Sequence, residues 1–214
     1  MKSPAFPVVI AAPSGAGKTS LARSLVQRGV GLEFSISATT RAPRPAEIDG
    51  RDYYFVDDAE FERQIAAGEL VEWAEVHGRH YGTPRRSIQE PLGRGQIVVL
   101  DIDVQGARQI RSAFPGAVLI FILPPTVGEM ARRLADRGSE GESELRTRLE
   151  TARQELGAAA DFDYVVVNDD FEAAVRALQD ILAAEKHKID RMQELPAVLE
   201  QMQNELAGLL KGSR

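Results

Sequence analysis

Eight residues near the start of the chain have the types and the order of a phosphate-binding loop. The octet reads Ala12, Pro13, Ser14, Gly15, Ala16, Gly17, Lys18 and Thr19. It stands between an apolar, strand-like run and a helix-like run, which is the context that such a loop needs. Backbone N–H groups at the turn would wrap a phosphate, and the helix dipole would add favourable charge. Lys18 would reach the β and γ phosphates of a nucleotide, and the Thr19 hydroxyl would bind Mg²⁺.

The first position of the octet departs from the strict pattern, which has a glycine where this chain has Ala12. Alanine fits there if its backbone φ angle is negative, and it is strained otherwise. An ordinary glycine-rich turn before a helix is the alternative interpretation. We favour the phosphate-binding loop, because both glycines, the lysine and the threonine are present in order.

Two aspartates suited to phosphoryl transfer follow an apolar run at 97–100. Asp101 ends this run, and Asp103 lies two residues further on. Enzymes with a phosphate-binding loop hold Mg²⁺ through an aspartate at the end of such a strand, directly or through water. If the strand reaches Asp103, both carboxylates point to one face. The alternative is that the two aspartates only cap the following helix.

Arginine and tyrosine residues gather in the first half of the chain, after the octet. Arg41 and Arg44 flank Pro43, which fixes one backbone torsion between them. Guanidinium groups bind phosphate oxygens in pairs, and tyrosine hydroxyls such as those of Tyr53 and Tyr81 donate well to phosphate. This segment therefore predicts a second anion-binding site.

Short apolar, β-rich runs alternate with helical patterns along the chain, which is typical of a doubly wound α/β fold. The expected strands are 8–11, 96–100, 117–123 and 164–167, and the expected helices are 18–27, 104–113, 127–136 and 171–188. We expect all four strands to be buried on both faces, as in a parallel sheet. Ligands then bind at the carboxyl ends of the strands, where the octet lies.

Two segments interrupt this alternation and predict insertions. The first, 35–89, is rich in Arg, Tyr, Thr and Gly. It contains a helix that we expect to start at Asp57 or Asp58 and to end at Gly68, and Trp73 is expected in its core. The second, 126–157, carries many Arg and Glu residues and predicts a mobile lid. For both segments, surface decoration without a binding role is the alternative.

The segment after residue 188 predicts a separate helix. Leucine and methionine residues recur there at three- and four-residue spacing, and Pro196 is expected at the first position of the helix. We expect this apolar stripe to pack on the domain itself. A helical contact between two copies of the chain is the alternative.

The composition excludes several classes of protein. The chain has 214 residues, of which 43% are hydrophobic, and its net charge is −6. With no cysteine and three scattered histidines, it has no disulfide and no zinc-binding pattern. The acidic balance disfavours a nucleic-acid partner. No apolar run approaches the roughly 20 residues that cross a bilayer, and the first residues do not form a secretory signal. We therefore expect a cytoplasmic protein that binds neither nucleic acid nor membrane.

Taken together, the motifs resemble those of bacterial guanylate kinases over about residues 8–188. The segments that carry the resemblance occur in family order: PSGAGKT at 13–19, SATTRAPR at 37–44, DGRDYYF at 49–55, EWAEV at 72–76, YGT at 81–83, DIDVQG at 101–106, and then an arginine-rich lid. The resemblance implies a P-loop α/β domain at 1–188, with a parallel sheet flanked by helices. Its core would comprise 1–34, 90–125 and 158–188, with a GMP-binding insertion at 35–89 and a lid at 126–157. The helical extension 189–214 lies outside the resemblance.

The resemblance also implies which residues bind GMP. The guanine would be read by Ser37, Glu72, Thr83 and Asp103. The phosphate of GMP would be held by Arg41, Arg44, Tyr53 and Tyr81, with Glu47 in a secondary position. A carboxylate suits guanine, because it can accept from N1–H and N2–H₂ together, whereas adenine has an acceptor at N1 and lacks the N2 amine.

For ATP and the chemical step, the resemblance implies a second set of residues. The octet would hold the phosphates of ATP, and Asn168 and Asp169 would lie beside the adenine. Mg²⁺ would be bound by Thr19 and Asp101. The residues expected to act on the transferring group are Lys18, Arg41, Arg133, Arg137 and Arg148.

The resemblance implies an ATP:GMP phosphotransferase that needs Mg²⁺. We expect a monomer or a homodimer, with the C-terminal helix as the candidate contact. A related kinase of a ribose phosphate is one alternative, but Glu72 and Asp103 would have no purpose there. A non-catalytic interaction module is another, although such modules usually lose the lysine or the glycines that this octet keeps. A P-loop GTPase would need an Asn-Lys-x-Asp motif late in the chain, and the sequence has none.

Overall fold

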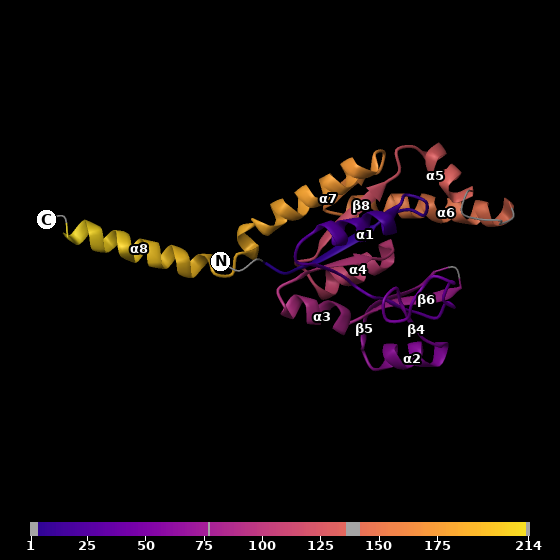
Figure 1. Ribbon diagram of the computed structural model, residues 1–214, viewed down its shortest axis with the longest axis horizontal. Helices are drawn as coiled ribbons and strands as arrows, with labels where there is room; N and C mark the ends of the chain where they lie inside the picture. Colours follow the sequence, from indigo (N-terminus) through magenta and orange to yellow (C-terminus); the bar gives the residue numbers. More distant parts are fainter. Residues whose placement is uncertain (1–3, 77, 136–141, 213–214) are drawn as a thin grey trace.

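The computed structural model describes residues 4–76, 78–135 and 142–212, which form an α/β fold around a parallel sheet (Figure 1). The strands of this sheet lie in the order β2-β7-β1-β8-β9. Their bounds are β1 Pro7–Ala11, β2 Leu32–Phe34, β7 Ile97–Asp101, β8 Val118–Leu123 and β9 Tyr164–Val167. Strand β1 runs between β7 and β8, so that Val9 pairs with Leu100 on one side and with Leu119 on the other. The octet therefore leaves the sheet at its centre.

Helices cover both faces of this sheet. Helices α1 (Lys18–Arg28) and α7 (Phe171–Lys186) pack on one face, and α3 (Arg86–Gly93) and α4 (Val104–Ala113) pack on the other. Successive residues of β1 point to opposite faces, so Ile10 is buried under α1 and α7 and Val9 under α4. Each such side chain contributes about 1.5–3 kcal/mol when fully buried. The predicted α/β class, central strands and flanking helices are confirmed.

The edge strand β9 is not buried on both faces, so that prediction was wrong for one of the four strands. Val166 is buried with the residues of α7, whereas Val165 and Val167 are 50% and 51% exposed. The hydrophobic cluster under α3 and α4 extends across the sheet to Leu119 of β8. Because β9 is the last strand in the order, its second face lies beyond this cluster. Strand β2 was not predicted, since it is only three residues long.

A smaller sheet is formed by residues 38–84, with the strand order β4-β3-β6-β5. Its bounds are β3 Ala38–Thr39, β4 Tyr54–Phe55, β5 Leu70–Val76 and β6 Arg79–Pro84. Helix α2 (Asp58–Ala66) packs on it and buries Phe61. The helix begins as predicted, because the Asp57 side chain accepts a hydrogen bond from the Glu60 N–H at 2.8 Å. Gly68 follows two residues after its end with a φ of 64°.

The segment predicted to be a lid forms two helices. Helices α5 (Val127–Ala135) and α6 (Glu142–Gly157) pack on each other through Met130, Leu149 and Ala152. A short 3₁₀ turn, η1 (Ala159–Asp161), then leads into β9. The boundary expected at residue 89, between the GMP-binding insertion and the core, falls inside α3. Ile88 of this helix is buried against the core sheet.

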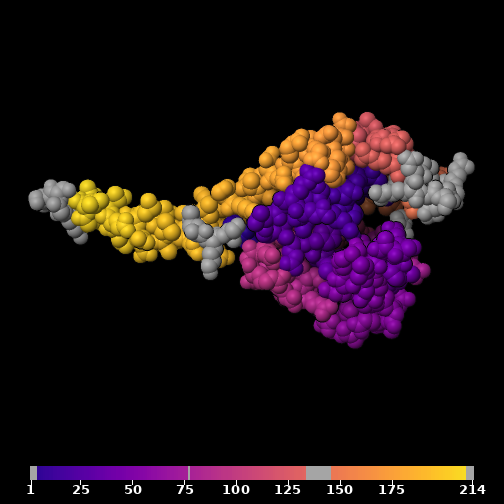
Figure 2. Space-filling view, in the orientation of Figure 1, coloured from indigo at the N-terminus to yellow at the C-terminus, as the bar shows by residue number. Residues whose placement is uncertain are grey.

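The chain ends in a long helix that projects from the body of the molecule. After a 3₁₀ turn, η2 (Ile189–Arg191), helix α8 (Leu195–Gly212) extends away from every other element (Figures 1 and 2). Its Leu199, Met202 and Leu206 are 48%, 56% and 59% exposed. The prediction that this stripe packs on the domain was therefore wrong. The helix starts at Leu195, one residue before the position that Pro196 suggested.

Among the described residues, no helix combines the length and the apolar character needed to span a membrane.

Candidate active site

The octet forms a tight turn between the end of β1 and the start of α1. Gly15 and Gly17 have φ angles of 86° and 85°, a left-handed conformation that favours glycine. A Cβ atom built on Gly17 would lie 2.5 Å from Nδ2 of Asn168. Ala12, at the position where the strict pattern has glycine, is 5% exposed and packs in the core with α1 and α7. Its methyl group therefore has a packing role.

Lys18, the first residue of α1, contacts the end of β7. Its Nζ lies 2.9 Å from Oδ1 of Asp101 and donates to the carbonyl of Ile102 at 2.6 Å. The lysine predicted to bind phosphate and the aspartate predicted to bind Mg²⁺ are thus brought together. Asp103 has a different contact, because its Oδ1 accepts from the Gly106 N–H at 2.8 Å and caps α4. The capping interpretation therefore applies to Asp103 but not to Asp101.

The side-chain oxygens of Asp101 and Thr19, the residues predicted to bind Mg²⁺, suit a hydrated ion. Oδ1 of Asp101 is a buried oxygen with no hydrogen bond of good geometry, although Lys18 lies beside it. Thr19 is exposed at the start of α1. Within the described ranges, no cluster of three or more His, Cys, Asp or Glu residues could hold a metal. Mg²⁺ is usually bound by one or two protein ligands together with water and substrate phosphates, so this donor set is compatible with it.

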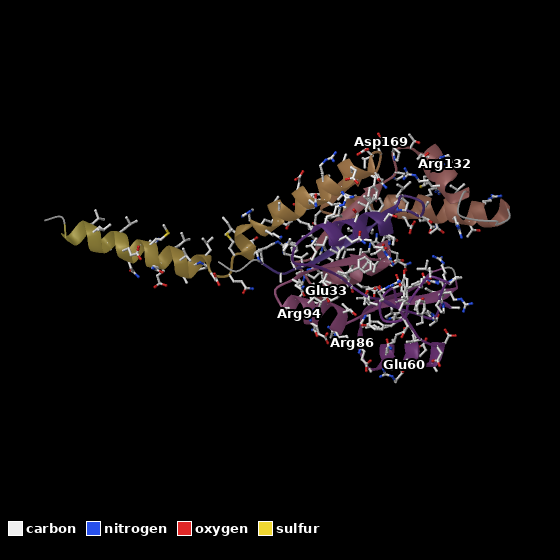
Figure 3. All side chains as sticks on the ribbon, viewed as in Figure 1. Glu33, Glu60, Arg86, Arg94, Arg132 and Asp169 are labelled. Atoms are coloured by element: carbon white, nitrogen blue, oxygen red, sulfur yellow. The ribbon has the colours of Figure 1, made fainter. Side chains whose placement is uncertain are left out.

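Asn168 braces the octet from the end of β9. It is 6% exposed, and its Nδ2 donates to the carbonyl of Ala16 at 2.7 Å. Its neighbour Asp169 is exposed at the turn before α7, on the side of the molecule toward Arg132 of α5 (Figure 3). The sequence motif marked both residues for the adenine of ATP. The contact of Asn168 shows a role in holding the turn.

A carboxylate from α6 also reaches the octet. Oε2 of Glu155 accepts a hydrogen bond from the Ser14 N–H at 3.2 Å. Burial raises the pKa of Glu155, while the Ser14 bond and the charge of Lys18 act in the opposite direction. An oxygen of Glu155 thus takes one of the N–H donors of the loop. No sequence pattern predicted this contact, because 141 residues separate the two partners.

Glu72 is the most buried carboxylate near the octet. It lies on the inward face of β5 and is 3% exposed. Its Oε1 accepts from the Thr83 hydroxyl on β6 at 2.5 Å. A Cβ atom built on Gly106 would lie 2.6 Å from its Oε2, so the carboxylate is seated against the first turn of α4. Asp103 caps the same turn, and the two predicted guanine-reading carboxylates therefore lie on either side of Gly106.

The alternation of side chains along β5 explains why the burial of Trp73, the neighbour of Glu72, was predicted wrongly. Trp73 points to the other face of β5 and is 44% exposed, so the prediction of a core tryptophan was wrong. Its backbone N–H and carbonyl are instead bonded to the side-chain amide of Gln109 on α4, at 3.2 and 2.9 Å. These two bonds hold β5 against α4 and so position Glu72.

We expect a stability effect from Glu72 that depends on pH. Burial is the main cause that raises its pKa to about 7, and the charge of Asp103 adds to it. The folded protein therefore keeps a proton on Glu72 that the unfolded chain loses above the ordinary pKa of 4.5. The stability from this group is fully present below about pH 4.5 and is lost as the pH rises through about 7.

The Glu72→Gln variant should therefore gain stability relative to the wild type as the pH rises from 5 to 8, by about 2.5 kcal/mol. Urea unfolding at both pH values measures this gain. The exposed Glu75 of the same strand supplies the control, Glu75→Gln, which should show no such gain. If the free energy of unfolding differs between wild type and variant by the same amount at the two pH values, the raised pKa of Glu72 is contradicted.

The predicted phosphate-binding residues form a cluster around Arg41. Its guanidinium makes two bonds to Glu47, both of 2.9 Å, and lies 5.4 Å from the centre of the Tyr53 ring. The ring of Tyr81 is 6.1 Å from that of Tyr53. The hydrogen bonds from Arg41 hold the pKa of Glu47 below its ordinary value. Glu47 thus offers Arg41 the paired oxygens that a phosphate would offer.

The remaining predicted site residues are Arg44, Ser37 and the three lid arginines. The Arg44 side chain is exposed, and its N–H donates to Glu47 at 2.8 Å. Ser37 is half-buried before β3. In the lid segment, Arg133 donates to Glu129 at 2.7 Å, and Arg148 is half-buried on α6. Arg137 lies outside the described residues.

Comparison with known proteins identifies the family. The family model described as guanylate kinase matches residues 5–185 of this chain. The guanylate kinase of Trichormus variabilis is 49% identical over 172 residues, which cover 80% of this chain and 86% of that protein. The one from Alkalilimnicola ehrlichii is 46% identical over 189 residues, covering 88% and 93%.

The solved structures agree with this result. The crystal structure of guanylate kinase from Anaplasma phagocytophilum matches with a TM-score of 0.79 and 36% identity, covering 93% of this chain and 95% of that one. The parallel sheet, the octet at its centre and the inserted small sheet are thus those of a known fold. The chain belongs to the guanylate kinase family.

Proposed function

We propose that this protein transfers the γ-phosphoryl group of ATP to GMP, forming ADP and GDP. The observation that carries the proposal is that the buried Glu72 and the half-buried Asp103 meet at Gly106. Asp103 lies two residues after Asp101, which pairs with Lys18. The residues expected to read the base and the loop expected to bind phosphate are therefore connected through the end of β7. The intact lysine and the two left-handed glycines favour catalysis over a non-catalytic module.

The proposal assigns guanine recognition to the residues around Gly106. Ionised Glu72 would accept from N1–H and N2–H₂ of the base, and the Thr83 hydroxyl fixes the direction of its carboxylate. Ser37 and Asp103 would complete the base-binding side. AMP would place the N1 lone pair against this carboxylate and lose both hydrogen bonds. Sites of this kind reject the wrong ligand by roughly 10⁴-fold.

The phosphate of GMP would be held by the Arg41 cluster. Arg41 is already pre-oriented by Glu47 and by the rings of Tyr53 and Phe55. Burial raises the pKa of Tyr53, so its hydroxyl stays protonated and can donate to a phosphate oxygen. Arg44 and Tyr81 would add further donors. Charge-assisted bonds of this type are about twice as strong as neutral ones.

The octet would hold ATP, with Asn168 and Asp169 near the adenine end. For phosphates to bind, the Ser14 N–H must be released from Glu155, so occupation of the loop and the position of α6 are coupled. A GMP phosphate oxygen would then attack the γ-phosphorus in line. Lys18 and the lid arginines, Arg133, Arg137 and Arg148, would stabilise the charge on the transferring group. Closure of the lid would exclude water.

Mg²⁺ is part of the proposal as the cofactor. Asp101 and Thr19 would hold it, directly or through water, and it would neutralise charge on the β- and γ-phosphate oxygens. The division of residues 1–188 into core, GMP-binding insertion and lid, and the cytoplasmic location, also remain predictions.

A screen of phosphoryl acceptors tests the proposed function. ADP formation is measured by a coupled assay with GMP, AMP, UMP and a ribose phosphate as acceptors, with and without EDTA. We expect kcat/KM for GMP to exceed that for AMP by roughly 10³–10⁴-fold, and chelation to abolish turnover. A protein that uses AMP as well as GMP, or prefers a ribose phosphate, would refute the proposal.

A further inference from the structure

One side chain of α4 binds the edge of the small sheet beside the residue expected to read the base. In the part of the chain that the structure describes, β5 is the last strand in the order β4-β3-β6-β5, so its outer edge faces no further strand. At Trp73 the side-chain amide of Gln109 takes that place. Its Oε1 accepts from the Trp73 N–H at 3.2 Å, and its Nε2 donates to the Trp73 carbonyl at 2.9 Å. One glutamine thus supplies the two hydrogen bonds that a neighbouring strand would make there.

The face of α4 that carries Gln109 also receives Glu72. Residues three apart share a face of a helix, and Asp103, Gly106 and Gln109 follow one another at this spacing. Glu72 lies against Gly106, and Gln109 binds the next residue of the strand. Two successive residues of β5 are therefore matched to two positions of α4 that lie about 4.5 Å apart along the helix axis.

The amide holds β5 in one register along α4. Successive side chains of a strand point to opposite faces, so a shift of β5 by one residue would turn Glu72 away from Gly106. Gly106 leaves room for the carboxylate but has no side chain that could hold the strand. Gln109 does hold it, because the acceptor and the donor of its amide each meet the matching backbone group of Trp73.

This hold matters because the two carboxylates expected to read the base stand on different elements. Glu72 belongs to β5, whereas Asp103 caps α4. The Thr83 hydroxyl fixes the direction of the Glu72 carboxylate, but Thr83 lies in the same sheet and would move with it. The bonds of Gln109 cross from the sheet to the helix, so they set the position of one carboxylate relative to the other.

We infer, on the basis of the proposed function, that Gln109 is a positioning residue that determines how strictly the site selects guanine. It would act through the placement of Glu72 and not by contact with the nucleotide. Recognition groups must be held within about 0.5 Å of their productive geometry, and supporting hydrogen bonds provide this precision.

The N2 amine of guanine is the group whose recognition depends most on this placement. Hypoxanthine, the base of IMP, keeps N1–H and lacks the N2 amine, so it offers the carboxylate of Glu72 one donor where guanine offers two. Two parallel hydrogen bonds require both carboxylate oxygens to be aligned with the base. A displaced carboxylate therefore loses the second bond first. The ratio of kcat/KM for GMP to that for IMP thus measures how firmly Glu72 is held.

Gln109→Met tests the inference, because methionine has a similar length and can make neither bond to Trp73. We expect the GMP-to-IMP ratio of kcat/KM to fall by about tenfold through a higher KM for GMP, since a misplacement of about 1 Å can cost up to 10²-fold. The kcat with GMP and the KM for ATP should stay within about twofold of the wild type.

Gln64→Met is the matched control for a general loosening of the small sheet. Gln64 is a half-buried glutamine, as Gln109 is, and it donates from α2 to Glu60 at 2.8 Å. The same substitution there removes a hydrogen bond without touching β5 or α4, so the GMP-to-IMP ratio should equal that of the wild type. An equal fall of the ratio in both variants would overturn the inference.

Hydrogen exchange at Trp73 gives a readout that does not depend on turnover. In Gln109→Met the Trp73 N–H loses its acceptor, so its exchange should be about tenfold faster than in the wild type. Gln64→Met should leave this rate unchanged. Unchanged exchange in Gln109→Met would overturn the inference, because the bonds would then not hold the strand.

Failure of the proposed function would look different from failure of this inference alone. A wild type that does not phosphorylate GMP would refute both. A wild type that prefers GMP to IMP, together with a Gln109→Met variant that exchanges faster at Trp73 but keeps the wild-type GMP-to-IMP ratio, would overturn only the role of Gln109 in selecting the base.

Discussion

Lys18→Ala is expected to lower kcat for GMP phosphorylation by about 10³-fold, a loss typical of removing a group that stabilises charge in the transition state. The Lys18 ammonium stands at the first turn of α1 beside Asp101, where the β and γ phosphates of ATP would lie. An alanine keeps the helix but supplies no cation. The buried Asp101 also loses its partner, so we expect a stability loss of about 1–3 kcal/mol in addition.

The two effects of this substitution are separated by measuring turnover and unfolding on the same preparation. Lys188→Ala is a matched control, because Lys188 also pairs with a buried carboxylate, Glu185, but lies at the far end of α7 from the octet. It should lose stability and keep its kcat. Near-wild-type turnover in folded Lys18→Ala would remove the octet from the chemistry.

Glu72→Gln is expected to lower kcat/KM for GMP by roughly 10²–10³-fold and to leave the KM for ATP within about twofold. The amide retains one acceptor oxygen but presents an NH₂ group to a donor of the guanine. Because Glu72 is 3% exposed and seated against Gly106, it has no room to turn away from the base. The substitution should therefore lower kcat/KM for GMP and leave the KM for ATP nearly unchanged.

Steady-state kinetics with each substrate varied in turn measure this split. The same-strand control, Glu75→Gln, should change neither constant, because Glu75 is exposed on the other face of β5. An equal loss toward ATP and GMP in Glu72→Gln would mean that the carboxylate supports the fold of the site instead of reading the base. Unfolding measurements distinguish the two explanations, because a variant that loses only base reading should still show the stability gain expected above neutral pH.

Sequence patterns predicted best the features whose residues lie close together along the chain. The octet, its strand and its helix are contiguous, so spacing alone predicted the turn that Gly15 and Gly17 form. The start of α2 at Asp57 was predicted for the same reason, since a cap acts within one helical turn. The family motifs also marked Glu72, Thr83 and Asp103, which the structure brings to one place around Gly106.

Contacts between distant segments were not predictable in the same way. The bond from Ser14 to Glu155 and the brace from Asn168 to Ala16 depend on how β9 and α6 are placed around the octet. The two exposed faces that sequence patterns misjudged, those of β9 and α8, carry apolar residues like any buried element. Burial depends on what lies opposite, and a single chain's pattern does not reveal that.

The amide of Gln109 gives the small sheet a pivot. Its two bonds to the Trp73 backbone continue the hydrogen bonding of β5, so the sheet is held firmly along that edge. On the opposite side it is held by the ion pair of Arg23 with Asp52, at 2.8 Å, a latch whose arginine is half exposed. Arg41 lies on the side that the ion pair holds, because it stacks on Tyr53, the residue after Asp52, whereas Glu72 lies on the strand that Gln109 holds. The arginine expected to hold the phosphate and the carboxylate expected to read the base thus have separate attachments to the core.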